Sequence, residues 1–405
     1  MQKKQTLSGP AMNVLMAEAL ELFLIKGMPA DKVIGELFKH HRIKDETRRG
    51  DIAGMFTLLV RFWRPLSTAS EFGDPTVDAQ VRYLLKAASL WKKIYAGKPV
   101  DSDDPKLVDR LSRYLRVRKL RESVTDWMDA QGVKELGEDR WEDMLKALNR
   151  TAPVYLRVNS LRTTREELQT KLAAEGIETV AETDLPFALR LNRYQNVFGT
   201  KAYDEGLFEV QDLSSQRVSE FAQIEPGMRV ADACAGNGGK TLHIAALLKN
   251  KGKLLAFDTS EHKLEVLRKR AAKAGADTVE VKHISSGKVM KRQDTGADRV
   301  LLDVPCSGTG VLRRNPDIRW NLHSDDLSRL HETQQQLLDS GSKMVKEGGK
   351  LIYATCSIWP SEGEEQIRSF LEKNTDWKLE DEYRTDPVQE NSDGFYMARL
   401  IFFGK

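Results

Sequence analysis

From Pro226 to the carboxyl terminus, short apolar segments of strand character alternate with longer segments of helical periodicity. Such alternation is typical of a parallel sheet that is covered by helices on both faces. The predicted strands are 228–233, 254–258, 279–282, 299–303, 350–355 and an edge strand at 395–403. The predicted helices are 240–248, 261–274, 325–345 and 361–372. Residues 226–405 are therefore expected to form an α/β domain with a Rossmann-like sheet, whose ligands bind at the carboxyl ends of the strands.

Residues 1–145 have a different pattern, because apolar residues recur at helical spacing and no strand-like segment interrupts them. An all-helical domain is predicted here, in which Asp31 and Asp45 are expected to cap the beginnings of two helices. The arginine-rich segment 110–121 is expected to form one helix with a strongly basic side. That side is interpreted as a charged face in solvent in preference to a ligand-binding face.

Residues 146–225 are predicted to form a small α+β module. Strand-like segments at 153–159 and 188–191 flank a helix that begins at a capping box formed by Thr164 and Glu167. With the helical region before this module and the α/β domain after it, three domains are expected.

The composition excludes several classes of protein. The chain has 405 residues, a formal net charge of +3 and 40% hydrophobic residues, so it can build sizeable cores and is not strongly basic overall. Its three cysteines include no pair at metal-ligand spacing, so neither a disulfide framework nor a metal site is expected. The polar amino-terminal segment lacks the pattern of a signal peptide, and no segment approaches the ~20 apolar residues of a membrane span. A cytoplasmic protein without a membrane partner is expected.

A glycine-rich loop follows the first predicted strand of the α/β domain and opens its first helix, with the sequence Asp232-Ala-Cys-Ala-Gly-Asn-Gly-Gly-Lys-Thr241. A P-loop would need glycine at the position of Cys234, and a dinucleotide fingerprint would need glycine at Thr241. A loop that binds a nucleoside without a pyrophosphate is the third interpretation. Asp258, 20 residues after Gly238, could accept hydrogen bonds from a ribose, although it could equally cap the next helix.

S-adenosylmethionine, which has a ribose and no phosphate, fits this pattern best among nucleoside cofactors. The candidate residues of its site are Cys234, Ala235, Gly236, Asn237, Gly238, Gly239, Lys240 and Asp258. The thiol of Cys234 is interpreted as a small core group, so that only the backbone at this position is expected to face the ligand.

Two later strands each end in a turn that carries a thiol. The segment 299–310 places Asp303 and Cys306 after one strand, and the segment 349–357 places Cys356 after another. Because the carboxyl ends of parallel strands lie at one edge of a sheet, these three side chains are expected to meet. A thiolate that attacks carbon 6 of cytosine makes carbon 5 nucleophilic enough to accept a methyl group. Asp303 could favour this addition by interacting with N3, and a base must then remove the proton from carbon 5.

Four motifs closely resemble those of the RNA 5-methylcytosine methyltransferases of the RsmB/Nop/Sun family. They are Asp303-Val-Pro-Cys-Ser-Gly-Thr-Gly310, Arg313-Arg-Asn-Pro-Asp317, Tyr353-Ala-Thr-Cys-Ser357 and Asp393-Gly-Phe-Tyr-Met-Ala-Arg399. The resemblance implies the fold of a class I S-adenosylmethionine-dependent methyltransferase. It also implies that Cys356 is the nucleophile, that Cys306 assists release of the product, and that Asp303 contributes to the cofactor site.

The sequence departs from the family pattern at two places. The loop Ala235–Lys240 has a glycine and an asparagine where the family usually has alanine and proline, which should loosen it. The acid that usually follows the third strand is missing, and Ser285 or Ser286 is the expected substitute. These departures concern affinity for the cofactor more than the chemistry.

RNA contacts are expected around the active turn, because a cytosine must leave its stack to be methylated. Arg313 and Arg314 follow that turn directly, with an ion pair to Asp317 as the structural alternative. Arg157 and Asn159 resemble an RNA-facing strand of the family.

The helical region resembles, more weakly, the NusB-like RNA-binding domain that precedes the catalytic part in one branch of the family. Residues 45–64 carry most of this resemblance, which implies 16S ribosomal RNA as the substrate. Two alternatives remain open at this point. One is a transfer RNA cytosine-5 methyltransferase, and the other is an RNA-binding ribosome-assembly factor with little activity.

Overall fold

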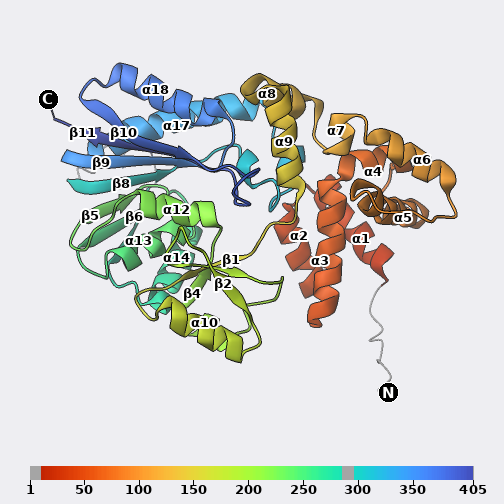
Figure 1. Ribbon diagram of the computed structural model, residues 1–405, viewed down its shortest axis with the longest axis horizontal. Helices are drawn as coiled ribbons and strands as arrows, with labels where there is room; N and C mark the ends of the chain where they lie inside the picture. Colours follow the sequence, from red (N-terminus) through yellow and green to blue (C-terminus); the bar gives the residue numbers. More distant parts are fainter. Residues whose placement is uncertain (1–10, 285–295, 405) are drawn as a thin grey trace. The chain divides into compact units, whose positions relative to one another are not determined.

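The computed structural model describes residues 11–284 and 296–404 (Figure 1). It divides into two compact units. The helical unit comprises Met1–Asn149 and Arg314–His323, and the sheet unit comprises Arg150–Arg313 and Ser324–Lys405. Among the described residues, no helix combines the length and the apolar character that crossing a bilayer requires.

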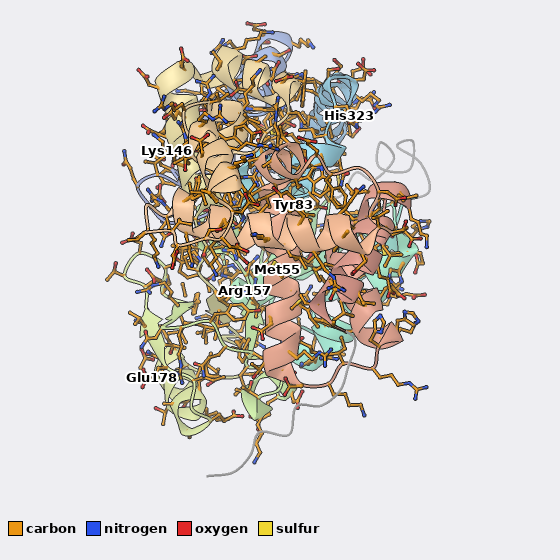
Figure 2. All side chains as sticks on the ribbon, turned by 90° about the vertical axis from the view of Figure 1, so that its right-hand side faces the viewer. Met55, Tyr83, Lys146, Arg157, Glu178 and His323 are labelled. Atoms are coloured by element: carbon orange, nitrogen blue, oxygen red, sulfur yellow. The ribbon has the colours of Figure 1, made fainter. Side chains whose placement is uncertain are left out.

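The helical unit is helical throughout its described residues, as the sequence predicted. Its helices are α1 Met12–Leu20, continued by a π-helical turn at Glu21–Ile25, α2 Ala30–His40, α3 Glu46–Arg61, α4 Trp63–Ser70, α5 Asp78–Tyr95, α6 Pro105–Tyr114, α7 Arg118–Arg121, α8 Asp126–Leu136, α9 Glu138–Asn149 and α16 Ile318–Asn321. Apolar faces of α1 to α6 bury a common core, against which Met55 of α3 and Tyr83 of α5 pack (labelled in Figure 2).

The structure confirms one of the two predicted helix caps and corrects the other, and it also corrects one predicted helix. Asp45 caps α3 by accepting a hydrogen bond from the backbone N–H of Arg48 at 2.7 Å. Asp31 is not a cap, because α2 begins one residue before it, at Ala30, and Asp31 lies in the first turn. The single basic helix expected at 110–121 is wrong, since the helix ends at Tyr114 and a separate short one begins at Arg118.

The arginines of this region form ion pairs within the helical unit. Arg118 donates to Asp129 and Glu138, both at 2.9 Å, and Arg121 lies 2.8 Å from Glu122. These pairs balance much of the positive charge that the sequence displays.

Residues 314–323 leave the sheet unit and pack within the helical unit, which corrects the expectation of one continuous domain at 226–405. Arg319 is fully buried and donates to the side-chain oxygen of Asn149 at 2.8 Å. The indole N–H of Trp320 donates to the backbone oxygen of Val60 at 2.7 Å. Long-range partners of this kind cannot be read from a local pattern.

The main sheet of the sheet unit has seven strands in the order β10-β11-β9-β8-β5-β6-β7. Their bounds are β5 Arg229–Asp232, β6 Lys253–Asp258, β7 Val279–His283, β8 Ala297–Asp303, β9 Val345–Thr355, β10 Trp377–Arg384 and β11 Tyr396–Phe402. Strands β7, β6, β5, β8 and β9 pair in parallel, and β11 and β10 complete the sheet in antiparallel fashion. The edge strand expected at 395–403 is thus an inner strand, and the outer strand β10 was missed because it is mostly polar.

Helices cover both faces of this sheet (Figure 1). They are α12 Leu213–Phe221, α13 Gly239–Leu247, α14 Glu261–Ala274, α17 Ser324–Gly341 and α18 Glu364–Lys373. One buried cluster joins the strands to α17 and α18, and another joins them to α12, α13 and α14. This double covering is the doubly wound α/β arrangement that the alternation predicted.

The small α+β module forms a second, antiparallel sheet in the sheet unit, with the order β2-β3-β1-β4. Its elements are β1 Tyr155–Val158, α10 Arg165–Ala174, β2 Thr179–Ala181, β3 Ala188–Leu191, α11 Lys201–Asp204 and β4 Phe208–Val210. The predicted capping box is present, since Thr164 and Glu167 each bond to the other's backbone N–H.

Candidate active site

The sheet order reverses at β5, because the chain continues to β6 on one side of β5 and reaches β8 on its other side. Ligands of doubly wound sheets bind at such a switch point, outside the carboxyl ends of the strands. The glycine loop follows β5, and the two thiol-bearing turns follow β8 and β9. All three segments therefore lie at the edge where the sequence placed the site.

The two thiols meet at this edge. The sulfur atoms of Cys306 and Cys356 lie 3.3 Å apart, within hydrogen-bonding distance, and both side chains are half-buried. The turns are also joined through backbone, since Gly310 N–H donates to the Cys356 carbonyl at 3.0 Å. A Cβ at Gly310 would lie 1.8 Å from the carbonyl oxygen of Gly394, so only glycine allows this approach.

The thiols differ in their electrostatic environment. The hydrogen bond with Cys356 raises the pKa of the Cys306 thiol well above its usual value, and so do burial, the electrostatic effect of Cys356 and, after these, the negative charge of Glu362. Burial raises the pKa of the third thiol, Cys234, and the carboxylates of Asp232, Asp303 and Asp258 raise it further. A thiol with a raised pKa holds its proton at neutral pH and acts as a donor more readily than as a nucleophile.

Asp303 and Lys240 form an ion pair at the end of β8. The Lys240 ammonium lies 2.7 Å from Asp303 Oδ2 and 5.1 Å from the centre of the Phe395 ring. The lysine is almost completely buried, whereas about a third of the Asp303 side chain is exposed. Lys240 therefore orients the Asp303 carboxylate, which stays partly open to solvent.

Asp258 holds the glycine loop. Its carboxylate accepts from the N–H of Gly236 at 2.9 Å and from that of Ser260 at 2.8 Å. The cap of α14 is Ser260, so the helix-cap alternative for Asp258 is replaced by a bond across the loop. A Cβ at Gly236 would meet no atom within 4 Å, so the loop borders open space there. Open space beside a glycine loop and an acid fits the nucleoside part of S-adenosylmethionine.

Arginines from outside the loop bind its carbonyl groups. Arg157 of β1 donates to the carbonyl of Gly239 at 2.6 Å and to the side chain of Gln211. Arg270 of α14 donates to the carbonyl of Asn237, also at 2.6 Å. Sequence reasoning missed Arg270 and Gln211, because only the folded chain brings them to the loop.

Three of the four residues expected to contact RNA are buried instead. Arg157 is 3% exposed, and Asn159 is 7% exposed and donates to the carbonyls of Gly206 and Ala274 at 2.8 Å. Arg313 is 2% exposed and forms ion pairs with Asp393 and Asp212. These residues stabilise the sheet unit, which contradicts the expectation that they face RNA.

Arg314 keeps a half-exposed position and lies in the helical unit, where it lines a cavity of about 510 Å³ together with Phe56 and Asp317. Its RNA-binding role stays a prediction. Ser285 and Ser286, the expected substitutes for the missing acid, lie outside the described residues.

The doubly wound sheet, the glycine loop after β5 and the acid after β6 define the class I S-adenosylmethionine-dependent methyltransferase fold. Residues 221–401 match the family model of the 16S rRNA methyltransferase RsmB/F, and residues 124–198 match the ferredoxin-like domain of RsmF/B-like methyltransferases. The chain belongs to this RsmB/F family.

Curated relatives include the ribosomal RNA small subunit methyltransferases B of Proteus mirabilis, 34% identical over 272 residues, and of Vibrio cholerae, 35% identical over 277 residues. Each match covers 66% of this chain and 63% of the relative, so the chain matches less than two thirds of these relatives' length.

Solved structures of similar fold include that of PH0851, with a TM-score of 0.79, 25% identity and coverage of 97% of this chain and 99% of the other. A methyltransferase homologue from Pyrococcus horikoshii has a TM-score of 0.63 and 27% identity, and covers 71% of this chain and 98% of its own.

Proposed function

We propose that this protein methylates carbon 5 of a cytosine in RNA, using S-adenosylmethionine, and that 16S ribosomal RNA is its substrate. The observation that carries this proposal is the 3.3 Å separation of the Cys306 and Cys356 sulfur atoms at the ligand-binding edge. Two neighbouring thiols there suit a reaction in which one forms a covalent bond with a pyrimidine and the other assists its cleavage. The names of the curated relatives support RNA as the substrate class.

In the proposed reaction, the thiolate of Cys356 adds to carbon 6 of the cytosine, and the electron pair of the carbon 5–carbon 6 bond makes carbon 5 nucleophilic. Asp303, oriented by Lys240, interacts with the N3 edge of the ring and favours this addition. S-adenosylmethionine supplies the methyl group for carbon 5. A base then removes the proton from carbon 5, and the bond between carbon 6 and sulfur breaks as Cys356 leaves as a thiolate. Cys306 stabilises the departing thiolate by donating its S–H.

The cofactor would lie against the glycine loop in this proposal. Backbone groups of residues 234–240 and the Asp258 carboxylate would bind its nucleoside part, and Asp303 would contribute to the same site. The bonds that Arg157 and Arg270 make to the loop compensate for the flexibility expected from its extra glycine.

The test is methyl transfer from labelled S-adenosylmethionine to 16S ribosomal RNA, with the modified nucleoside identified by mass spectrometry. The wild-type protein should produce 5-methylcytidine. Cys356→Ala should abolish transfer, because no thiolate remains to add to carbon 6. Cys306→Ala should accumulate a protein–RNA adduct that survives denaturation, because addition is retained and elimination is slowed.

Cys234→Ala is the matched control, since it removes the third thiol and leaves the backbone that is expected to face the cofactor. It should retain most of the activity. Methyl transfer by Cys356→Ala at the wild-type rate would contradict the mechanism. Tight binding of RNA without any binding of S-adenosylmethionine in calorimetry would favour an assembly factor instead.

A further inference from the structure

Glu362 is a fully buried carboxylate beside the thiols that the proposed reaction does not use. It lies in the 3-10 turn Pro360–Glu362, which follows the Cys356 turn. Its carboxylate accepts from the N–H of Ser307 at 2.8 Å, from the Ser307 hydroxyl, and from the amide of Gln334 at 3.1 Å. A buried carboxylate with this set of donors is costly to form and is well fixed in place.

Through Ser307, this carboxylate reaches both thiol-bearing turns. Ser307 directly follows Cys306, and Ser357 directly follows Cys356. The hydroxyl of Ser307 bonds to that of Ser357 at 3.3 Å, and the hydroxyl of Thr309 bonds to both, at 3.2 Å and 3.1 Å. The two turns are thus joined by a buried hydroxyl network anchored on one carboxylate.

The donors to this carboxylate are all neutral. Over residues 11–284 and 296–404, Glu362 makes no ion pair. Gln334, which also donates to the Pro305 carbonyl at 3.0 Å, ties the carboxylate to the residue before Cys306. The negative charge therefore acts on the Cys306 thiol in a site of low polarity.

Other titratable or charged groups also surround the thiol pair. They are Asp303 with Lys240 at the end of β8, Tyr353 on β9, whose hydroxyl donates to the Glu362 carbonyl, and Arg384 on β10, which pairs with Glu364 and donates to the Ser357 carbonyl. The two cations are each paired with another carboxylate, so Glu362 remains the uncompensated charge beside Cys306.

We propose that Glu362 is a positioning residue that locks the two thiol turns together and keeps the shared proton of the thiol pair on Cys306. A negative charge beside Cys306 disfavours a second negative charge there, so Cys306 is the thiol that keeps its proton. Cys306 then donates its S–H to the Cys356 thiolate, both before attack and during elimination. The consequence for catalysis rests on the proposed function, but the location of the proton does not.

The proton can be located by alkylation, without RNA or cofactor. The protein is treated with iodoacetamide between pH 6 and pH 10, and modification of Cys306 and Cys356 is quantified separately by peptide mass spectrometry. In the wild-type protein at pH 8, Cys356 should react at least about tenfold faster than Cys306, since only thiolates react. Equal rates, or faster reaction of Cys306, would overturn the proposal without the need for any variant.

Glu362→Gln removes the negative charge and leaves the hydrogen bonds largely in place. The amide oxygen can still accept from Ser307 and Gln334, while the amide N–H faces the Ser307 hydroxyl. The rate of Cys306 alkylation at pH 8 should rise about tenfold, which corresponds to a pKa about one unit lower. Glu365→Gln, an exposed neighbour on α18, should leave the profile unchanged. An unchanged Cys306 profile in a folded Glu362→Gln protein would refute the role of the charge.

Glu362→Asp tests the positioning role, because the shorter side chain keeps the negative charge but moves the carboxylate away from Ser307 and Gln334. The pH profile of Cys306 alkylation in this variant should resemble that of the wild type. The kcat for methyl transfer should fall about tenfold or more at unchanged KM. An unchanged kcat would refute the positioning role. Failure of the proposed methylation would abolish turnover in every variant, yet it would leave the alkylation results intact, so the two failures can be distinguished.

Discussion

The thiol turns and the glycine loop lie at the same edge of the sheet, but different interactions hold them in place. Short-range hydroxyl and backbone bonds join the thiol turns, and most of these bonds come from the residues next to the cysteines. The glycine loop is held by charged side chains from other elements, above all Arg157 and Arg270. The bonds between the thiol turns are thus made largely by residues adjacent to the cysteines, whereas those that hold the cofactor loop are made by side chains of other elements.

The two regions should therefore respond differently to amino-acid substitutions. The thiol turns should tolerate changes elsewhere in the sheet unit, but they should fail when their own close packing is altered. The glycine loop should tolerate small changes of its own residues where it borders open space, but it should loosen when a distant arginine is removed. Three substitutions test this contrast.

Gly310→Ala should have the largest effect, because the new Cβ would lie 1.8 Å from the carbonyl oxygen of Gly394. Backbone atoms on both sides leave no flexible side chain to move, so the free energy of unfolding should fall by about 3 kcal/mol or more. Gly236→Ala in the glycine loop is the matched control. It meets no atom within 4 Å, and its positive φ of 54° should cost about 1 kcal/mol. Denaturation by urea measures both, and equal losses would remove the contrast between the two regions.

The same contrast explains what the sequence could predict. Cys306, Cys356 and Asp303 stand at the ends of apolar segments, and the topology of a parallel sheet alone brings such ends together. Their neighbours Ser307 and Ser357 belong to the same motifs. Hydroxyl groups in turns often form hydrogen bonds with nearby backbone, so the sequence did not indicate that these two belong to a network. The main elements of the α/β domain were likewise predicted from periodicity, except for the polar strand β10.

The errors concern residues whose role depends on distant partners. Arg157 and Asn159 were expected to face RNA because they resemble an RNA-facing strand of the family, and Arg313 because it directly follows the active turn. Their burial requires acceptors that come from far along the chain, such as the Ala274 carbonyl for Asn159 and Asp393 for Arg313. No periodic pattern records such pairs.

His243 should give the loop side of the sheet unit a pH dependence. It lies in α13, directly after the glycine loop, and burial lowers its pKa from 6.5 to about 4, although Glu220 lies 3.2 Å away. The folded state therefore binds this proton less readily than the unfolded state. Stability is lost as the pH falls from 6.5 towards 4, by up to about 3 kcal/mol.

Burial raises the pKa of the Asp232 carboxyl to about 6, and this group acts in the opposite direction over the same range. The effect of His243 is therefore measured as the difference in unfolding free energy between His243→Leu and the wild type. Relative to the wild type, the variant should gain about 3 kcal/mol between pH 7 and pH 4. His262→Leu, an exposed histidine of α14, should show no such change. A constant difference for His243→Leu would show that this histidine is protonated freely in the folded state.

Arg157→Met should have the smallest effect on stability and the most specific effect on the site. Methionine fills much of the buried space but cannot donate to the Gly239 carbonyl, so the beginning of α13 and the glycine loop lose an anchor. Affinity for S-adenosylmethionine, measured by calorimetry, should fall about tenfold, or ~1.4 kcal/mol. Alkylation of Cys306 and Cys356 should keep its wild-type pH profile, because the hydroxyl network of the thiol turns does not include Arg157.

Arg190→Met, on the neighbouring strand β3, removes a guanidinium that pairs with Glu182 near the surface, and it should leave cofactor affinity unchanged. If Arg157→Met changed the alkylation profile of the cysteines as much as the affinity for S-adenosylmethionine, the two regions would not be independent. The anchor of the glycine loop would then also position the reactive thiols.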